Sequence, residues 1–280
     1  MLPLIDYHIH ERRSRDALTT SIPEYIKVAE ERGVTEIAFT NHLITEGLYT
    51  ELSIKLSEIP EYIEEIRQAQ AGTKVRLLAG LEVDYFPEEE RHLETIISEH
   101  DFDFILGSTH FINGVYLGSR TKAEKFFINR SISKSADEYY TTWGKAVESG
   151  LFDVMAHPDY WRKYLHFYGK SAAWQNYGSV VFEALEKAAK CGVGIEVNTA
   201  GIIAGTGHFY PIPEFLLAAH EAGIEIVTVG SDSHTAGALG FKAEEAAKRL
   251  YETGFTSMST FKGRRNKKIP INDILRKHRP

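Results

Sequence analysis

Short β-rich runs alternate with longer helical patterns along the chain, and this alternation limits its fold more than any other feature. Parallel strands need such helical crossovers, so the pattern is typical of a parallel α/β fold. The expected strands cover residues 4–7, 36–40, 75–81, 102–106, 153–156, 194–197 and 225–229. The expected helices cover residues 23–32, 53–70, 87–99, 136–149, 179–190, 213–222 and 243–253.

The helix boundaries carry local signals. Ser21 and Glu24 have the spacing of a capping box, and Pro213 suits the first turn of a helix. No break in composition separates the seven βα units. We therefore predict a distorted TIM-like (β/α)7 barrel, as a single domain over residues 1–280 with its motif-bearing core at about 4–239. A doubly wound open sheet is the alternative.

The overall charge limits the possible partners. The chain has 32 Lys and Arg against 39 Asp and Glu, a net charge of −7. Binding to nucleic acid or to an anionic membrane requires a basic surface, so we expect neither partner. The basic segment 262–268 is expected to be a solvated loop.

The chain also carries indications of its location. Its one cysteine, Cys191, cannot form an internal disulfide and is expected to be buried as a small apolar residue. The sequence shows no leader peptide and no apolar run of about 18 residues. We therefore expect a cytoplasmic protein.

Histidines and carboxylates recur where the predicted strands end. Alternation along the first strand sends Asp6, His8 and His10 to one face. Two imidazoles on one face can hold a metal ion, and Asp6 could orient one of them. Taken alone, the pair is equally compatible with surface histidines on an edge strand.

The same placement recurs further along the chain, which favours the metal interpretation. The residues that close the later strands are His42, Glu82, His110, His157 and finally Asp232 with His234. In a barrel, the carboxyl ends of all strands meet at one rim, where active sites are built. The pattern therefore predicts a metalloenzyme.

These motifs resemble the polymerase-and-histidinol-phosphatase (PHP) family. The resemblance runs from Leu4 to about Leu239 and is greatest to the stand-alone histidinol-phosphatases. It is carried by a His-x-His pair at residues 8–10, Gly-x-Glu at 80–82, Gly-Ser-x-His at 107–110, His-Pro at 157–158, Glu-Val-Asn-Thr-Ala-Gly at 196–201 and Ser-Asp-x-His at 231–234. It implies a barrel that holds three divalent metal ions, Zn, Mn or Fe.

The resemblance also implies how nine ligands would be shared. One ion would take His8, His10, Glu82 and Asp232; a second would share Glu82 and add His110 and His157; the third would take Asp16, His42 and His234. Asp16 depends only on its position six residues after His10, and a solvated loop aspartate is its alternative.

The expected charge of this pocket indicates its chemistry. Three divalent ions outweigh three carboxylates, so the cavity would be cationic and would suit a phosphate dianion. Paired ions lower the pKa of a bridging water, and the resulting hydroxide can attack phosphorus without a protein nucleophile. We predict a phosphatase of a small phosphate monoester, with L-histidinol phosphate of histidine biosynthesis as the expected substrate.

The predicted substrate contacts are less specific. Arg162 is the candidate phosphate clamp, with a surface arginine as its alternative, and His208 is a candidate contact in a strand-end loop. The chain departs from its relatives at Asn41, where they have aspartate, and at Ile203, where they have a phosphate-binding arginine. A PHP phosphoesterase acting on a nucleotide or sugar-like phosphate is thus the first alternative, and a non-catalytic metal-binding module is the second. The oligomeric state and the identity of the metal stay open.

Overall fold

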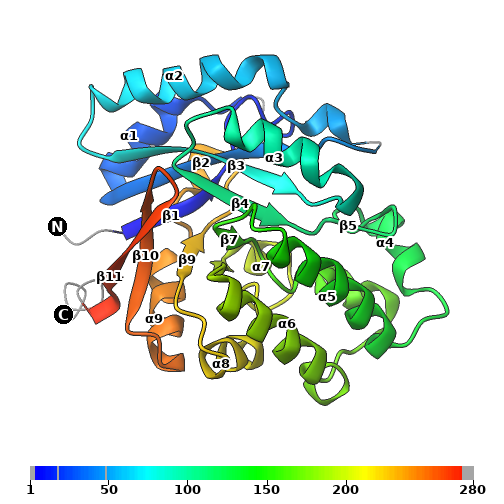
Figure 1. The fold of residues 1–280 in the computed structure, drawn as a ribbon. Coiled ribbons are helices and arrows are strands. Elements are labelled where there is room, and N and C mark those ends of the chain that lie inside the picture. Colours follow the sequence, from blue (N-terminus) through cyan, green and yellow to red (C-terminus); the bar gives the residue numbers. More distant parts are fainter. Residues whose placement is uncertain (1–3, 18, 48, 273–280) are drawn as a thin grey trace.

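Within the residues that the computed structural model describes (4–17, 19–47 and 49–272), seven strands form one parallel sheet. Their order in the sheet follows the chain without insertions (Figure 1). The strands are β1 (Leu4–Ile9), β2 (Val34–Leu43), β3 (Arg76–Asp84), β4 (Phe104–Ser108), β7 (Val154–Met155), β8 (Gly194–Asn198) and β9 (Val227–Gly230). Each of them overlaps one of the strands expected from the sequence.

The first and last strands of the sheet meet, so the sheet is nearly closed into a barrel. A parallel bridge joins Ile9 to Ser233, which follows β9. The backbone N–H of His10 donates to the carbonyl of Ser233 at 2.8 Å, and the N–H of Ser233 donates to the carbonyl of His8 at 3.2 Å. This confirms the predicted (β/α)7 barrel, whose distortions are the short closing contact and the two-residue strand β7.

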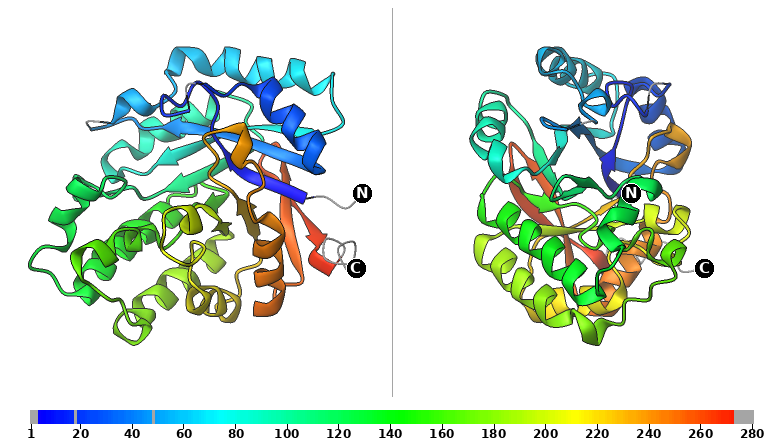
Figure 2. Two further views of the ribbon diagram at one scale, coloured as in Figure 1. Left: turned by 180° about the vertical axis from the view of Figure 1, so that it is seen from behind. Right: turned by 90° about the vertical axis from the view of Figure 1, so that its right-hand side faces the viewer.

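Helices surround the barrel (Figure 2). They are α1 (Ile22–Arg32), α2 (Ile59–Gln70), α3 (Glu90–Ser98), α4 (Arg120–Phe127), α5 (Ile132–Glu148), α6 (Gly178–Cys191), α7 (Ala200–Ile203), α8 (Pro213–Glu221) and α9 (Ala243–Thr253). The capping box before α1 is confirmed, since the Glu24 carboxylate accepts from the Ser21 N–H at 2.7 Å. None of the helices in the described part of the chain is long and apolar enough to cross a bilayer.

Two local predictions about the helices are wrong. The helix expected at 53–70 begins only at Ile59, because a separate 3₁₀ turn covers Leu56–Glu58 and Pro60 suits the first turn of the helix that follows. Cys191 is exposed at the end of α6 rather than buried.

The basic segment 262–268 is not a solvated loop. It forms most of an antiparallel hairpin of β10 (Ser257–Lys262) and β11 (Arg265–Pro270). Gly263 and Arg264 both have positive φ, 53° and 63°, as a two-residue type I′ turn requires. The basic side chains obscured the alternation that places Met258 and Phe261 in the core.

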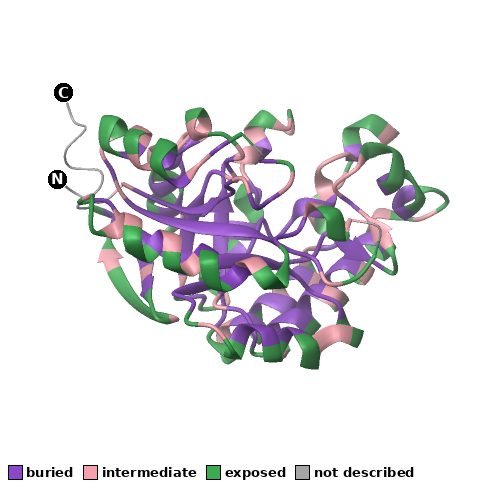
Figure 3. Cartoon of the chain, turned by 90° about the horizontal axis from the view of Figure 1, so that it is seen from above, coloured by how far each residue is buried: buried purple, intermediate pink, exposed green. Residues whose placement is uncertain are grey.

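This hairpin lies against the amino-terminal end of the barrel. The Phe261 ring packs on Phe104 and Tyr7, with ring centroids 4.8 and 5.9 Å apart, and the Phe261 N–H donates to the Tyr7 hydroxyl at 2.8 Å. Viewed from above, the strands of the barrel are buried on both faces (Figure 3). One end of the barrel is therefore filled by apolar packing, which leaves the opposite end for a site.

Most of the core is one contiguous cluster that extends from β1 to β10, and a small second cluster contains Ile44, Phe86 and Phe111. This agrees with a single domain, which stays a prediction, and residues 1–3 and 273–280 of the predicted domain lie outside the described residues.

Candidate metal centre

The fold brings all nine predicted ligand side chains together at the carboxyl-terminal rim of the barrel. They are supplied by β1 and the loop after it (His8, His10 and Asp16), by β2 (His42), by β3 (Glu82), and by the segments after β4, β7 and β9 (His110, His157, Asp232 and His234). β2 and β3 are longer than expected, so His42 and Glu82 lie within strands. Alternation alone then directs both side chains into the barrel.

Glu82 lies at the centre of this cluster. Its Oε2 lies 2.8 Å from Nδ1 of His42, 3.3 Å from Nε2 of His8 and 3.6 Å from Nε2 of His10. The Glu82 side chain is 1% exposed. One carboxylate oxygen therefore faces three imidazoles inside the barrel.

The other oxygen of Glu82 faces a second pair of imidazoles. Oε1 lies 2.9 Å from Nε2 of His157 and 3.7 Å from Nε2 of His110, and it accepts a hydrogen bond from the Ser108 hydroxyl at 2.5 Å. His110, His157 and Glu82 offer ligand atoms that lie within 4.8 Å of one another. Glu82 is thus positioned to bridge two groups of ligands.

Two aspartates complete the cluster. Oδ1 of Asp232 lies 3.5 Å from Nε2 of His8 and 3.3 Å from Nε2 of His10. Oδ2 of Asp16 lies 3.4 Å from Nε2 of His42 and 3.3 Å from Nε2 of His234. The loop residue Asp16, the least certain of the nine from sequence, therefore lies against the two histidines with which it was grouped.

The residues fit divalent metal ions. Nε2 of His8, Nε2 of His10, Nδ1 of His42 and Oε2 of Glu82 are buried and form no hydrogen bond within the described residues. Buried polar atoms are normally paired, so four such atoms around one point indicate a missing partner. Imidazole nitrogen and carboxylate oxygen together suit Zn, Mn and Fe.

Electrostatics within the cluster favour ionised carboxylates. Burial opposes the ionisation of Glu82, but His8, His42 and His110 hold the pKa of its carboxyl well below the ordinary value. Burial, together with the adjacent His234 and His42, lowers the pKa of His10 to about 3. The Glu82 carboxylate is thus held anionic and the His10 ring neutral, the forms in which these two groups bind metal.

Side chains behind the ligands orient three of the rings. Nδ1 of His8 lies 2.9 Å from Glu196, and Nδ1 of His110 lies 3.1 Å from Asp84. Nδ1 of His10 lies 3.1 Å from the Ser14 hydroxyl. In each case Nε2 is left to face the centre, an arrangement that fixes the tautomer of metal-binding histidines.

The expected role of Asp6 is corrected by these contacts. Its carboxylate accepts hydrogen bonds from the N–H and hydroxyl of Ser231 and the N–H of Gly240, and it contacts the backbone rather than the ring of His8. Asp6 therefore fixes the chain that carries Asp232. The group that orients His8 is Glu196, on β8.

Glu196 and Asp84 were missed from sequence, although one signal was available. Glu196 and Asn198 are spaced by two residues on β8, as Glu82 and Asp84 are on β3. The alternation that paired His8 with His10 applies equally to them.

The contact between Glu196 and His8 also requires a glycine on the next strand. A Cβ at Gly230 would clash with both Glu196 and His8, so only glycine fits there.

The amide at position 41 also has a local explanation. Nδ2 of Asn41 donates to the buried carboxylate of Glu11 at 2.7 Å, and Oδ1 of Asn41 accepts from Ser14 at 3.1 Å. An aspartate at position 41 would place a second carboxylate against Glu11. The asparagine at position 41, where the family has aspartate, therefore suits the neighbouring carboxylate of Glu11 in this chain.

Two of the proposed ligands have a strained backbone. His157 and Asp232 have positive φ, 23° and 55°. Such conformations cost about 1–3 kcal/mol and persist where the surroundings impose them, commonly at functional sites.

The structure does not bring Arg162 or His208 against these nine side chains. The Arg162 guanidinium donates to the Tyr177 hydroxyl and to the carbonyl of Ala172, and its Nε lies 3.6 Å from Asp159. His208 lines the same cavity as Arg162. Their contact with substrate stays a prediction.

Comparison with known proteins agrees with this geometry. Residues 6–200 match the family model described as the PHP domain. A probable histidinol-phosphatase of Deinococcus radiodurans is 31% identical over 95% of this chain and 99% of its own length. A histidinol-phosphatase of Lactococcus lactis is 26% identical over 92% of this chain and 94% of its own length.

A solved structure has the same fold. Histidinol phosphate phosphatase from Lactococcus lactis, complexed with Zn, L-histidinol and phosphate, superposes with a TM-score of 0.80 and 25% identity. The match covers 94% of this chain and 98% of that one. With its barrel, its clustered histidines and carboxylates, and a family match over residues 6–200, this chain belongs to the PHP domain family.

Proposed function

We propose that this chain is a metal-dependent phosphatase that hydrolyses L-histidinol phosphate. The observation that carries the proposal is the Glu82 carboxylate, which faces five imidazoles at the rim of a barrel shared with a zinc-containing histidinol phosphate phosphatase. The relatives that match nearly the full length of the chain are named histidinol-phosphatase or probable histidinol-phosphatase.

Three groups of residues would hold up to three divalent ions, Zn, Mn or Fe. The groups are His8, His10, Glu82 and Asp232; Glu82, His110 and His157; and Asp16, His42 and His234. When bound, such ions supply positive charge for a phosphate and the Lewis acidity that makes water nucleophilic near neutral pH. The clustering of ligand atoms among the described residues supports this arrangement, but it does not give the number of ions.

Residues beside the cluster would exclude water and add positive charge. The Tyr160 ring lies 4.6 Å from the ring of His157 and 4.7 Å from that of His110, and it covers this side of the centre. The Lys163 ammonium donates to the Tyr160 hydroxyl at 2.8 Å and lies 4.7 Å from the centre of its ring. Lys163 thus places a cation against the Tyr160 ring, and it joins Arg162 as a candidate for binding phosphate.

A second candidate is a PHP phosphoesterase with another small phosphate ester as substrate. Ile203, the residue in place of an expected arginine, lies at the end of α7 and is 61% exposed. The Ile203 side chain supplies no positive charge for a phosphate. This position therefore gives no support for L-histidinol phosphate over another phosphate ester as the substrate. A cytoplasmic location and the absence of nucleic-acid and membrane partners stay predictions.

A substrate panel distinguishes the two candidates. Purified protein loaded with Zn or Mn should release phosphate from L-histidinol phosphate with a kcat/KM of about 10⁴ M⁻¹s⁻¹ or more. Nucleotide and sugar phosphates should be turned over at least about a hundredfold less efficiently, the scale of discrimination that a binding pocket achieves. If one of these other esters were the preferred substrate, the second candidate function would be supported instead. If the metal-loaded protein hydrolysed none of the esters, both candidates would be contradicted.

A further inference from the structure

A cavity of about 240 Å³ lies beside the metal centre, between the segment after β7 and the loop that precedes α8. We call it the Asp159 cavity. Residues that line it include Asp159, Arg162, His166, Thr206, His208 and Tyr210. None of the nine candidate metal ligands, all of them described, is among its lining residues, so it is separate from the metal centre.

Two buried polar atoms of its lining residues have no partner. Oδ1 of Asp159 and the hydroxyl of Tyr210 form no hydrogen bond to any described residue, and the two side chains are 1% and 3% exposed. The other oxygen of Asp159 accepts from the N–H of Ile212 at 3.0 Å and faces Arg162. Because unpaired buried oxygens are costly, Oδ1 of Asp159 indicates a ligand with a hydrogen-bond donor, and the Tyr210 hydroxyl can either donate to such a ligand or accept from it.

The arginine and the lysine of the cavity are already engaged. The Arg162 guanidinium contacts Tyr177, Ala172 and Asp159, and the Lys170 ammonium donates to the carbonyl of Arg130 at 2.9 Å. The buried side-chain atoms of this cavity that lack a partner among the described residues are therefore a carboxylate oxygen and a hydroxyl. That combination suits an amine or another N–H group better than a phosphate.

The Asp159 cavity is adjacent to the metal centre. Asp159 follows His157 by two residues, and the Tyr160 ring lies 4.6 Å from the ring of His157. The ring of Tyr210 lies 5.8 Å from that of Tyr160. The backbone of Tyr210 pairs with Asn198, whose side chain lies 3.3 Å from Nδ1 of His8. The cavity is thus connected to the metal centre in two ways: through Tyr160 to the candidate metal ligand His157, and through Asn198 to the candidate metal ligand His8.

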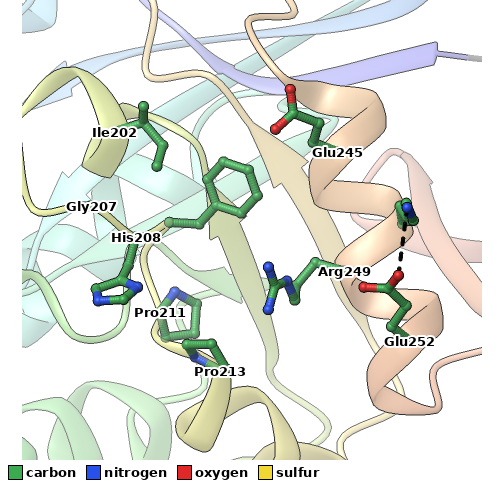
Figure 4. A pocket seen from close by; sticks show the side chains of 10 residues that line it. Ile202, Gly207, His208, Pro211, Pro213, Glu245, Arg249 and Glu252 are labelled. Carbon is green, nitrogen blue, oxygen red and sulfur yellow. Dashed lines mark ion pairs between the residues drawn. The ribbon is translucent and has the colours of Figure 1, made fainter.

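A neighbouring pocket on the other side of the same loop offers a contrast (Figure 4). It lies between His208 and α9, where Arg249 and Glu252 are exposed and Glu252 pairs with Lys248 at 3.7 Å. Within the described chain, no residue of this pocket has a buried polar atom without a partner. The neighbouring pocket therefore gives no comparable indication that it binds a ligand.

We propose that the Asp159 cavity binds the amine-bearing end of the substrate, with the Asp159 carboxylate on the ammonium group and the Tyr210 hydroxyl on a second polar nitrogen. This rests on the proposed function, because L-histidinol carries an amine and an imidazole at the end remote from its phosphate. Asp159 and Tyr210 are then specificity-determining residues, and Arg162 is a positioning residue that holds the Asp159 carboxylate.

Titration calorimetry with L-histidinol tests the proposal without depending on hydrolysis. In metal-loaded protein, Asp159→Asn keeps the size of the side chain and should weaken L-histidinol binding about tenfold or more, as expected for loss of a charged partner. Tyr210→Phe should weaken it by about two- to tenfold. Glu252→Gln, an equally conservative change in the neighbouring pocket, should leave binding and activity unchanged.

A kinetic comparison separates recognition from a structural role of Asp159. In Asp159→Asn, the ratio of kcat/KM for L-histidinol phosphate to that for phenyl phosphate, which has no amine, should fall about tenfold. An unchanged ratio with unchanged L-histidinol affinity would overturn the proposal while the proposed function stands. A wild-type protein that neither binds L-histidinol nor hydrolyses its phosphate would overturn both.

Discussion

The two ends of the barrel both bury carboxylates, but Glu82 at the carboxyl-terminal end is paired differently from those at the amino-terminal end. At the amino-terminal end the partly buried Asp153 and the buried Asp103 and Glu36 each meet a guanidinium: Asp153 lies 3.1 Å from Arg264, Asp103 lies 2.5 Å from Arg67, and Glu36 lies 2.8 Å from Arg76. At the carboxyl-terminal end Glu82 faces, among the described residues, only imidazoles and the Ser108 hydroxyl.

The difference shows which end serves stability and which serves function. Arginine is always charged, and these three carboxylates also accept hydrogen bonds from the Tyr7 hydroxyl or from backbone N–H groups, so their oxygens need no further partner. Imidazoles are neutral metal ligands in the relevant form, and at the carboxyl-terminal end they leave buried nitrogens without hydrogen bonds among the described residues. Barrel enzymes place their active sites at the latter end.

The largest effect is expected from Glu82. Glu82→Ala removes the oxygen atoms shared by both ligand groups, so phosphatase activity should fall by at least about 10³-fold. Metal content, measured by mass spectrometry of the purified protein, should fall with it. Glu82→Gln is the matched control for size. If Glu82→Ala retained wild-type activity, the carboxyl-terminal end would not be the catalytic one.

Metal removal should affect the same end reversibly. Treatment with a chelator should abolish activity and lower Tm by about 5 °C, because ions that bind only the folded state stabilise it. Readdition of Zn or Mn should restore both quantities. A Tm and an activity that are insensitive to chelation would contradict the interpretation of the unpaired ring nitrogens.

A carboxylate at the opposite end should show the reverse behaviour. Asp153→Ala leaves the Nε–H of Arg264 and the N–H of Ile105 without their acceptor, while the Arg264 guanidinium keeps its hydrogen bond to the carbonyl of Leu151. We expect the free energy of unfolding to fall by about 3 kcal/mol, with no change in the kcat of folded protein. Denaturant titration and steady-state kinetics on one preparation measure both quantities, and a lowered kcat would show that the two ends are coupled.

The smallest effect is expected at the edge of the carboxyl-terminal end. Ile203→Arg introduces a cation on an exposed position of α7 and should lower the KM for L-histidinol phosphate by about three- to tenfold. Ile203→Gln, which adds length without charge, is the control. An unchanged KM would show that position 203 does not contact the phosphate in this chain.

Much of the barrel and its cluster was predictable because the signals are local. Strand alternation groups His8 with His10, and strand ends collect His110, His157, Asp232 and His234 at one rim. The hairpin at 257–270 was missed because its basic side chains suggested solvent, although its buried residues Met258 and Phe261 form part of the core.

The contacts that orient the ligand side chains were harder to predict from the sequence. His8 and Glu196 are 188 residues apart, and Asp6 and Ser231 are 225 apart. No local periodicity connects residues at such separations. The positive φ of His157 likewise depends on neighbours rather than on its own side chain.

The sequence by itself therefore determined the class of fold and eight of the nine residues that gather at one rim, because both follow from periodicity and strand direction; Asp16 came from the family resemblance. The tertiary structure alone decided that Glu196 rather than Asp6 orients His8, and that Arg162 holds Asp159 beside a cavity. Hydrogen bonds form within about 3 Å, and only the closed barrel brings such distant residues that close.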